Sequence, residues 1–310
     1  MLGPDRAIRS HGALSQEHHF ESLRVDYLMP GNRVNHLKRS VSVWALMVAL
    51  STAAVCICAA ANINLELEQL RRQAISYAST PVEFLAPPPS AAVRPQVVFH
   101  GDRGRKEVAL TFDACATRGP SGYDEALIRV LIETRTPATL FLGGKWMLEH
   151  AQPTRRLAAA DIFEFANHSF LHPHMTRISD EQAHRELAWT QIVMYSLAGR
   201  LAALYRPPFG EHDERIARIA AKLGLTTVQF DLASGDPDPT ASKERLVRSV
   251  RERAVNGSIV VMHMNGRGWN TAQALPEIIA ELHQKGFRFV TVGEMLRTSA
   301  SAGGDAARRY

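Results

Sequence analysis

Two hydrophobic patterns alternate along the chain from residue 108 onward. Short apolar runs rich in β-branched and aromatic residues predict strands, and longer stretches with apolar residues on one helical face predict helices. The predicted strands are residues 108–112, 138–142, 162–166, 204–206, 226–230, 258–262 and 288–291. The predicted helices are residues 124–134, 154–160, 180–198, 211–223, 243–255 and 271–285. Ser179 and Gln182 form a capping-box pattern before helix 180–198, and Gly224 supplies a left-handed stop after helix 211–223.

This alternation predicts an α/β fold with a mostly parallel sheet, because parallel neighbours need a crossover helix between them. Seven strand-containing units favour a closed or nearly closed barrel. An open doubly wound sheet is the competing architecture. No G-x-G-x-x-G turn follows strand 108–112, so the pattern gives no support for a dinucleotide site.

The amino-terminal part predicts export. Residues 41–61 contain no charged side chain and follow Arg33, Lys38 and Arg39, which is typical of a signal peptide or a transmembrane anchor. The small residues at 59–61 also suit a signal peptidase, so cleavage and anchoring both stay open. The predicted organisation is an undefined basic segment at 1–40, the apolar segment at 41–61, a proline-rich linker at 62–96, one domain at 97–298 and a flexible tail at 299–310. We therefore expect a periplasmic or cell-envelope location, with one inner-membrane helix if the segment is uncleaved.

The amino-acid composition limits the kinds of partner that this chain is expected to bind. A hydrophobic content of 45% over 310 residues allows a sizeable core. The net charge of +5 comes without a basic block interleaved with aromatics, so a nucleic-acid partner is not expected. Two of the three cysteines lie in the apolar segment, which leaves Cys115 alone downstream and no disulfide framework.

Chemically active side chains fall at the carboxyl ends of different predicted strands. In a barrel these ends form one face, so we expect one shared site there. The residues are Asp113, His168, His172, Arg206, Asp231, Asp236 and His263.

The residue types indicate a hydrolytic site. His168 and His172, four residues apart, are expected on one side of a helical turn, where both can reach one cation. Asp113 follows an apolar strand and needs a charged partner, for which Arg206 is the candidate. With a carboxylate nearby, His263 would stay protonated and act as a general acid. One metal, one base and one acid are what hydrolysis of an amide or ester requires.

Five motifs in order carry a family resemblance. They are Thr111-Phe112-Asp113, His168-Ser169-x-x-His172-Pro173, Arg206-Pro207-Pro208-Phe209, Ser234-Gly235-Asp236 and Ile259-Val260-Val261-Met262-His263. This set, spread over residues 108–296, resembles the polysaccharide deacetylases of carbohydrate esterase family 4, the NodB-homology domain.

The resemblance implies a deformed (β/α)7-type barrel that removes acetyl groups from an N-acetylated polysaccharide of the peptidoglycan or chitooligosaccharide type. It implies a divalent ion held by His168 and His172, with zinc as first choice and cobalt, nickel or manganese as alternatives. Mapped by motif, Asp113 resembles the catalytic base, Arg206 the residue that orients it, and His263 the acid, tuned by Asp236. Phe209 would help hold the oxyanion through its backbone N–H, and Val261 would receive the acetyl methyl group.

Two departures from the family pattern leave alternatives open. Ala114 stands where the family has a second aspartate that completes the metal site, so a weak or inactive glycan-binding pseudoenzyme is the alternative function. Cys115, the next residue, fits either a thiolate ligand or a small buried thiol. Pro237 replaces an aromatic residue after Asp236, and Asp231 is a rival partner for His263. Trp269, in a glycine-rich segment, fits either stacking on a sugar ring or packing within its loop.

Overall fold

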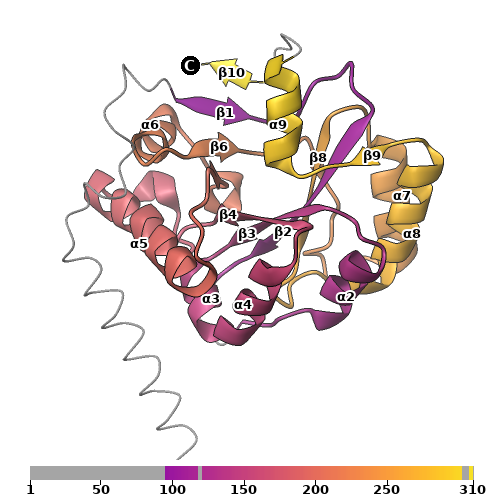
Figure 1. The fold of residues 1–310 in the computed structure, drawn as a ribbon, viewed down its shortest axis with the longest axis horizontal. Coiled ribbons are helices and arrows are strands. Elements are labelled where there is room, and N and C mark those ends of the chain that lie inside the picture. The colour runs from indigo at the N-terminus through magenta and orange to yellow at the C-terminus, as the bar shows by residue number, and fades with distance from the viewer. Residues whose placement is uncertain (1–94, 118–120, 302–306, 310) are drawn as a thin grey trace, which may run out of the picture. The chain divides into compact units, whose positions relative to one another are not determined.

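The computed structural model describes residues 95–117, 121–301 and 307–309 (Figure 1). The predicted segments 1–40 and 41–61 and nearly all of the linker 62–96 lie outside the described residues. Within the part that is described, no helix combines the length and apolarity needed to cross a bilayer.

The described chain alternates strands with helices, as the sequence predicts. The strands are β1 (Gln96–Val98), β2 (Glu107–Ala114), β3 (Ala138–Leu142), β4 (Phe163–Asn167), β5 (Leu204–Tyr205), β6 (Thr226–Val228), β7 (Leu232–Ala233), β8 (Ser258–His263), β9 (Arg288–Phe289) and β10 (Ala307–Arg309). The helices are α2 (Glu125–Glu133), α3 (Gly144–Glu149), α4 (Ala151–Ala159), α5 (Asp180–Ala198), α6 (Glu214–Lys222), α7 (Lys243–Arg253), α8 (Thr271–Gln284) and α9 (Val292–Ser301). The 3₁₀ turns are η2 (Met175–Arg177) and η3 (Pro208–Gly210).

The prediction of a parallel α/β fold is confirmed. Of the closed or nearly closed barrel that was predicted, the described strands form a curled sheet that does not close. The strand order is β10-β1-β6-β5-β4-β3-β2-β8-β7, with β9 added beside β2. Every pairing is parallel except the one between β1 and β10. Among the described strands no ladder joins β7 to β1 or β10. The sheet is therefore a curled, open barrel with most helices around its outside (Figure 1).

Local signals fixed some boundaries well. The observed bounds of β3 and α5 equal the predicted ones, and the capping box of Ser179 and Gln182 is present at the start of α5. Helix α6 begins three residues later than predicted because Asp213 caps it, accepting from the N–H of Ile216. The pattern missed β1 and β7, which are very short, and α9. It also missed α3, which starts after Gly143 with Gly144, a poor helix former.

Strand β2 lies at the centre of the sheet between β3 and β8, and all of its residues are buried. Leu110, Phe112 and Ala114 belong to the main apolar cluster, which holds the outer helices on the sheet. Ala109 belongs to a second apolar cluster, to which Val292 and Met295 of α9 also contribute. Because successive strand residues face opposite sides, Thr111 and Asp113 share the face of Ala109. Polar groups therefore continue the inner face of β2 towards its carboxyl end.

Candidate active site

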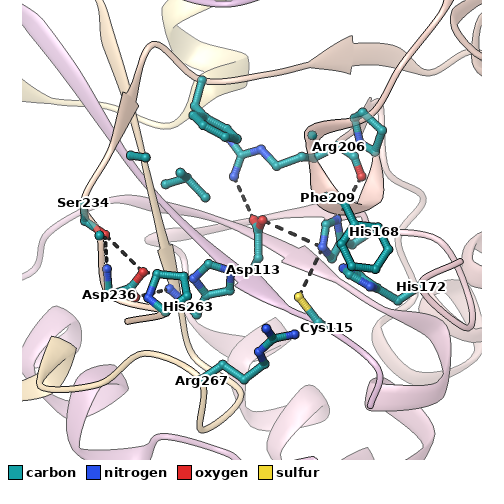
Figure 2. A pocket seen from close by; sticks show the side chains of 17 residues that line it. Asp113, Cys115, His168, His172, Arg206, Phe209, Ser234, Asp236, His263 and Arg267 are labelled. Carbon is teal, nitrogen blue, oxygen red and sulfur yellow. Dashed lines mark hydrogen bonds and ion pairs between the residues drawn. The ribbon is translucent and has the colours of Figure 1, made fainter. Parts of the chain in front are cut away.

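One pocket at the carboxyl ends of the strands collects most of the predicted site residues (Figure 2). Those that line it are Asp113, His168, His172, Arg206, Phe209, Asp236, Val261 and His263. Trp269 is outside this lining. The residue is 49% exposed, and its backbone N–H donates to the carbonyl of Asp236. The lining also includes Cys115, whose orientation the sequence left open, and Arg267, which sequence reasoning did not single out.

A buried ion pair forms the floor of the pocket. Arg206 Nη1 donates to Asp113 Oδ1 at 2.8 Å, and the two side chains are 1% and 7% exposed. The guanidinium also lies 3.9 Å from the ring centroid of Phe141 and donates to Thr111 Oγ1. Burial by itself raises the pKa of Asp113, but the charges of Arg206, His168 and His263 and the hydrogen bond from Arg206 together outweigh burial and hold that pKa below its ordinary value. Asp113 is therefore a carboxylate at neutral pH, the form that a general base requires.

His168 presents one defined nitrogen to the pocket. Its Nδ1 lies 2.9 Å from the backbone carbonyl of Arg206. A carbonyl only accepts, so Nδ1 carries the proton of the neutral ring and Nε2 keeps a free lone pair. Nε2 lies 3.4 Å from Cys115 Sγ and 3.8 Å from Asp113 Oδ2. Such a carbonyl contact is the usual support of a metal-binding histidine.

The loop after β4 brings His172 beside His168, but not through a helical turn. Ser169 and His172 both adopt the left-handed backbone conformation, with φ of 61° and 60°. The Glu186 carboxylate accepts the N–H groups of Phe170 and Leu171 and so ties the loop to α5. The two imidazole centroids end 5.0 Å apart. The expectation that both rings share a helical turn is therefore wrong, although the expectation that they meet beyond the strand end is correct.

Three donors converge where the resemblance implies a metal ion. One ligand atom each from Cys115, His168 and His172 lies within 4.8 Å of the others. One thiolate and two imidazoles are ligands that zinc and cobalt accept readily. The residues present therefore fit a divalent ion of this type. Ala114, where the family has its aspartate, packs in the main apolar cluster instead.

His263 and Asp236 form the second charged pair of the pocket. His263 Nδ1 lies 3.0 Å from Asp236 Oδ1, and the backbone N–H of His263 donates to Oδ2. Ser234 and Thr271 donate their hydroxyls to the same carboxylate. Burial lowers the pKa of His263, but hydrogen bonding with Asp236 and Cys115 and the charges of Asp236 and Asp113 together outweigh burial, and the pKa rises to about 10. The ring is therefore protonated at neutral pH.

The rival partner Asp231 is engaged elsewhere. Its carboxylate pairs with Arg103 and accepts from the Ser258 hydroxyl and the Ile259 N–H. In this structure, the carboxylate hydrogen-bonded to His263 is that of Asp236.

Phe209 holds a strained position on the pocket rim. Its φ is 58°, its ring stacks on His174 at a centroid distance of 4.1 Å, and it meets His172 edge-on at 4.6 Å. A non-glycine residue in this conformation persists only where its surroundings enforce it, and such residues cluster at functional sites.

The sequence of this chain is similar to those of known proteins. A sequence model described as polysaccharide deacetylase matches residues 100–228. The chain is 28% identical over 204 residues to a peptidoglycan-N-acetylglucosamine deacetylase of Bacillus cereus, covering 65% of this chain and 72% of that protein. The alignment with this chain covers 26%, 62% and 31% of the length of three further curated relatives, which is less than two thirds of each.

Two solved structures resemble the fold. A family 4 carbohydrate esterase from Streptomyces lividans, in complex with acetate, has 35% identity and a TM-score of 0.53 over 58% of this chain and 90% of that one. A mutant, with restored enzymatic activity, of a CE4-family pseudoenzyme from Bacillus anthracis has 25% identity and a TM-score of 0.59 over 65% and 71% of the two chains.

Proposed function

The chain belongs to the polysaccharide deacetylases of carbohydrate esterase family 4, and from this premise we propose that it is a metal-dependent hydrolase that removes acetyl groups from an N-acetylated glycan. The proposed substrate is of the peptidoglycan or chitooligosaccharide type. The charge-free segment 41–61 supports export to the periplasm or cell envelope, with tethering to the inner membrane if the segment is not cleaved.

The observation that carries this proposal is a carboxylate and a protonated imidazole facing one pocket from paired positions. Asp113 on β2 and His263 on β8 are register partners, and both side chains line the pocket. Hydrolysis of an acetamide needs a base for the attacking water and an acid for the departing amine. These two residues supply both groups.

The proposed mechanism assigns one step to each residue. Asp113 Oδ2 takes the proton of the attacking water, while Arg206 holds Oδ1 and so orients the carboxylate. His263 then donates its proton to the amine nitrogen as the bond from carbon to nitrogen breaks. His168, His172 and Cys115 would hold a divalent ion, which supplies Lewis-acid polarisation of the acyl carbonyl. The N–H of Phe209 and the side chain of Val261 are the proposed contacts of the oxyanion and the acetyl methyl group, and Trp269 is a proposed contact for sugars outside the pocket.

The alternative, a glycan-binding pseudoenzyme, rests on Ala114 and on the similarity to a CE4-family pseudoenzyme. The convergence of Cys115 with the two histidines supports the enzyme instead, because a third donor stands in the pocket without residue 114.

Metal removal tests the function directly. Acetate release from N-acetylated oligosaccharides should fall to background after thorough chelation and return when zinc or cobalt is added, because the donor set prefers these ions. Acetate is measured for the full-length protein on a panel that includes chitooligosaccharides and peptidoglycan fragments. Full activity under chelation would remove the metal from the mechanism, and absence of turnover by the metal-loaded protein would favour the pseudoenzyme.

Replacement of Asp236 by asparagine should move the alkaline limb of the pH profile. The acid must be protonated to act, so activity is expected up to the raised pKa of His263, about 10. Without the Asp236 charge, that pKa falls towards the ordinary value of 6.5, and kcat/KM should decline at correspondingly lower pH. Profiles of kcat/KM against pH for Asp236→Asn, with Asp231→Asn as the control, measure the shift. A limb that moves equally in both variants would contradict the pairing.

The position of Arg267 in the pocket indicates that the enzyme prefers acidic glycans. Its guanidinium lines the pocket and turns towards Cys115 and His263 (Figure 2), and it has no acidic partner among the residues the structure describes. A sugar that carries a carboxylate, such as the lactyl group of N-acetylmuramic acid, would supply that partner. Arg267→Ala should raise KM about fivefold for such a substrate, roughly 1 kcal/mol of ion pairing, and leave a neutral chitooligosaccharide unchanged. Arg267→Lys is the control, and equal losses on both substrates would refute the preference.

A further inference from the structure

The carboxyl end of β2 places residues 113 and 115 on one face and residue 114 on the other. Asp113 points into the pocket, and Ala114 packs with Leu110 and Phe112 in the main apolar cluster. The alternation continues past the strand end, so Cys115 lines the same pocket as Asp113 (Figure 2). The Cys115 side chain therefore reaches the site, whereas the methyl group of Ala114 packs in the apolar cluster.

Two hydrogen bonds to backbone carbonyls hold the turn after β2 and with it the orientation of the Cys115 side chain. Asn265 donates its side-chain amide to the Cys115 carbonyl, and Gly143 donates its N–H to the Ala114 carbonyl. A Cβ at Gly143 would lie 3.0 Å from the Ala114 carbonyl oxygen, so this close approach depends on glycine. The turn after β2 is thus held between the loop that follows β8 and the end of β3.

The surroundings of the thiol are those of a ligand. Cys115 is 3% exposed, and its Sγ lies 3.4 Å from His168 Nε2, the ring nitrogen that does not contact the Arg206 carbonyl. His172 contributes the third atom of the same cluster. A buried cysteine that only fills space would meet apolar neighbours, but here two imidazole nitrogens converge on its sulfur.

We propose that Cys115 binds the metal as a thiolate and is its third protein ligand, so that this chain has a Cys-His-His site in place of its family's carboxylate site. Three protein ligands leave a coordination position for water or substrate, as in catalytic zinc sites. A thiolate favours zinc and cobalt over magnesium, calcium and manganese. The inference rests on the proposed function only in assuming that this ion serves the deacetylation.

Cobalt gives a readout that is independent of turnover. A thiolate bound to cobalt(II) produces a sulfur-to-metal charge-transfer band in the near ultraviolet, and carboxylate and imidazole ligands do not. Cobalt(II) is titrated into the metal-free full-length protein. The Cys56→Ser/Cys58→Ser variant is the matched background, because it leaves Cys115 as the only cysteine. The band should appear there with saturation at one ion per chain.

Substitutions of Cys115 identify the ligand. Cys115→Ser should abolish the band and lower zinc affinity by more than about 100-fold, because even residues that merely support a ligand are worth 10–100-fold. Cys115→Asp returns an anionic donor to the same face and should recover zinc binding without the band. Circular dichroism checks that each variant is folded.

The outcomes separate this inference from the proposed function. Cobalt bound with wild-type affinity but without the band, or zinc affinity unchanged in Cys115→Ser, would overturn thiolate ligation while leaving deacetylation possible. A Cys115-dependent band in a protein that releases no acetate would support the site and refute the enzyme.

Discussion

Replacing Asp113 by asparagine should lower kcat/KM for acetate release by about 10²–10⁴-fold, the usual contribution of a general base. The amide keeps the size of the carboxylate and can still accept from Arg206, but it cannot take a proton from water. The loss should appear mainly in kcat, because the proposed role of Asp113 is in the chemical step. Steady-state kinetics of the metal-loaded variant measure it.

The control for this variant is Asp161→Asn. Among the described residues Asp161 pairs with Arg135 on the surface, and its side chain is 80% exposed. Its substitution should leave both kinetic constants unchanged. If Asp113→Asn kept near-normal kcat while binding metal normally, another group would have to be the base.

Replacing Arg206 by methionine should have the largest effect on stability. Arg206 is almost fully buried, and its removal leaves the carboxylate of Asp113, which is itself 7% exposed, without its guanidinium partner. Breaking one side of such a buried pair lowers the free energy of unfolding by about 3–5 kcal/mol. Chemical denaturation of the metal-free protein measures this change without interference from the ion.

A double substitution separates the pair from general packing. Arg206→Met combined with Asp113→Leu removes both charges, and an apolar replacement of a buried pair is often close to neutral. The double variant should therefore be more stable than Arg206→Met alone. Arg185→Met is the exposed control, because the pair of Arg185 with Glu181 lies in solvent and should contribute little. If Arg206→Met and Arg185→Met were equally stable, the buried pair would not have the assigned importance.

The sequence predicts the parts of this molecule that depend on local pattern. The bounds of β3 and α5 follow from apolar periodicity and a capping box, and β2 and β8 were predicted within two residues at each end. The positions of Asp113 and His263 at strand ends likewise place both in one pocket, since parallel strands end at the same edge. The openness of the sheet was not predictable, because closure depends on edge pairings between distant strands.

The details of the site that the sequence missed are set by tertiary contacts. No glycine marks the left-handed positions at Ser169 and His172, and the Glu186 carboxylate that ties this loop to α5 lies 16 residues beyond Phe170 in the chain. The orientation of Cys115 depends on Asn265, which is 150 residues away in sequence. Arg267 gave no sequence signal beyond lying in a glycine-rich stretch after His263. These features become visible only when the strands are assembled.

The register of β2 against β8 determines where the chain can tolerate insertions and deletions. Asp113 and His263 sit opposite one another in a hydrogen-bonded ladder, so their separation is set by the spacing of neighbouring strands. Insertions or exchanges in the surrounding loops can reshape which glycan is accepted without disturbing that separation. Deleting a single residue within β8 before His263 would turn its ring to the opposite side of the sheet. Variation in substrate choice is therefore expected in the connections, and intolerance of length changes in these two strands.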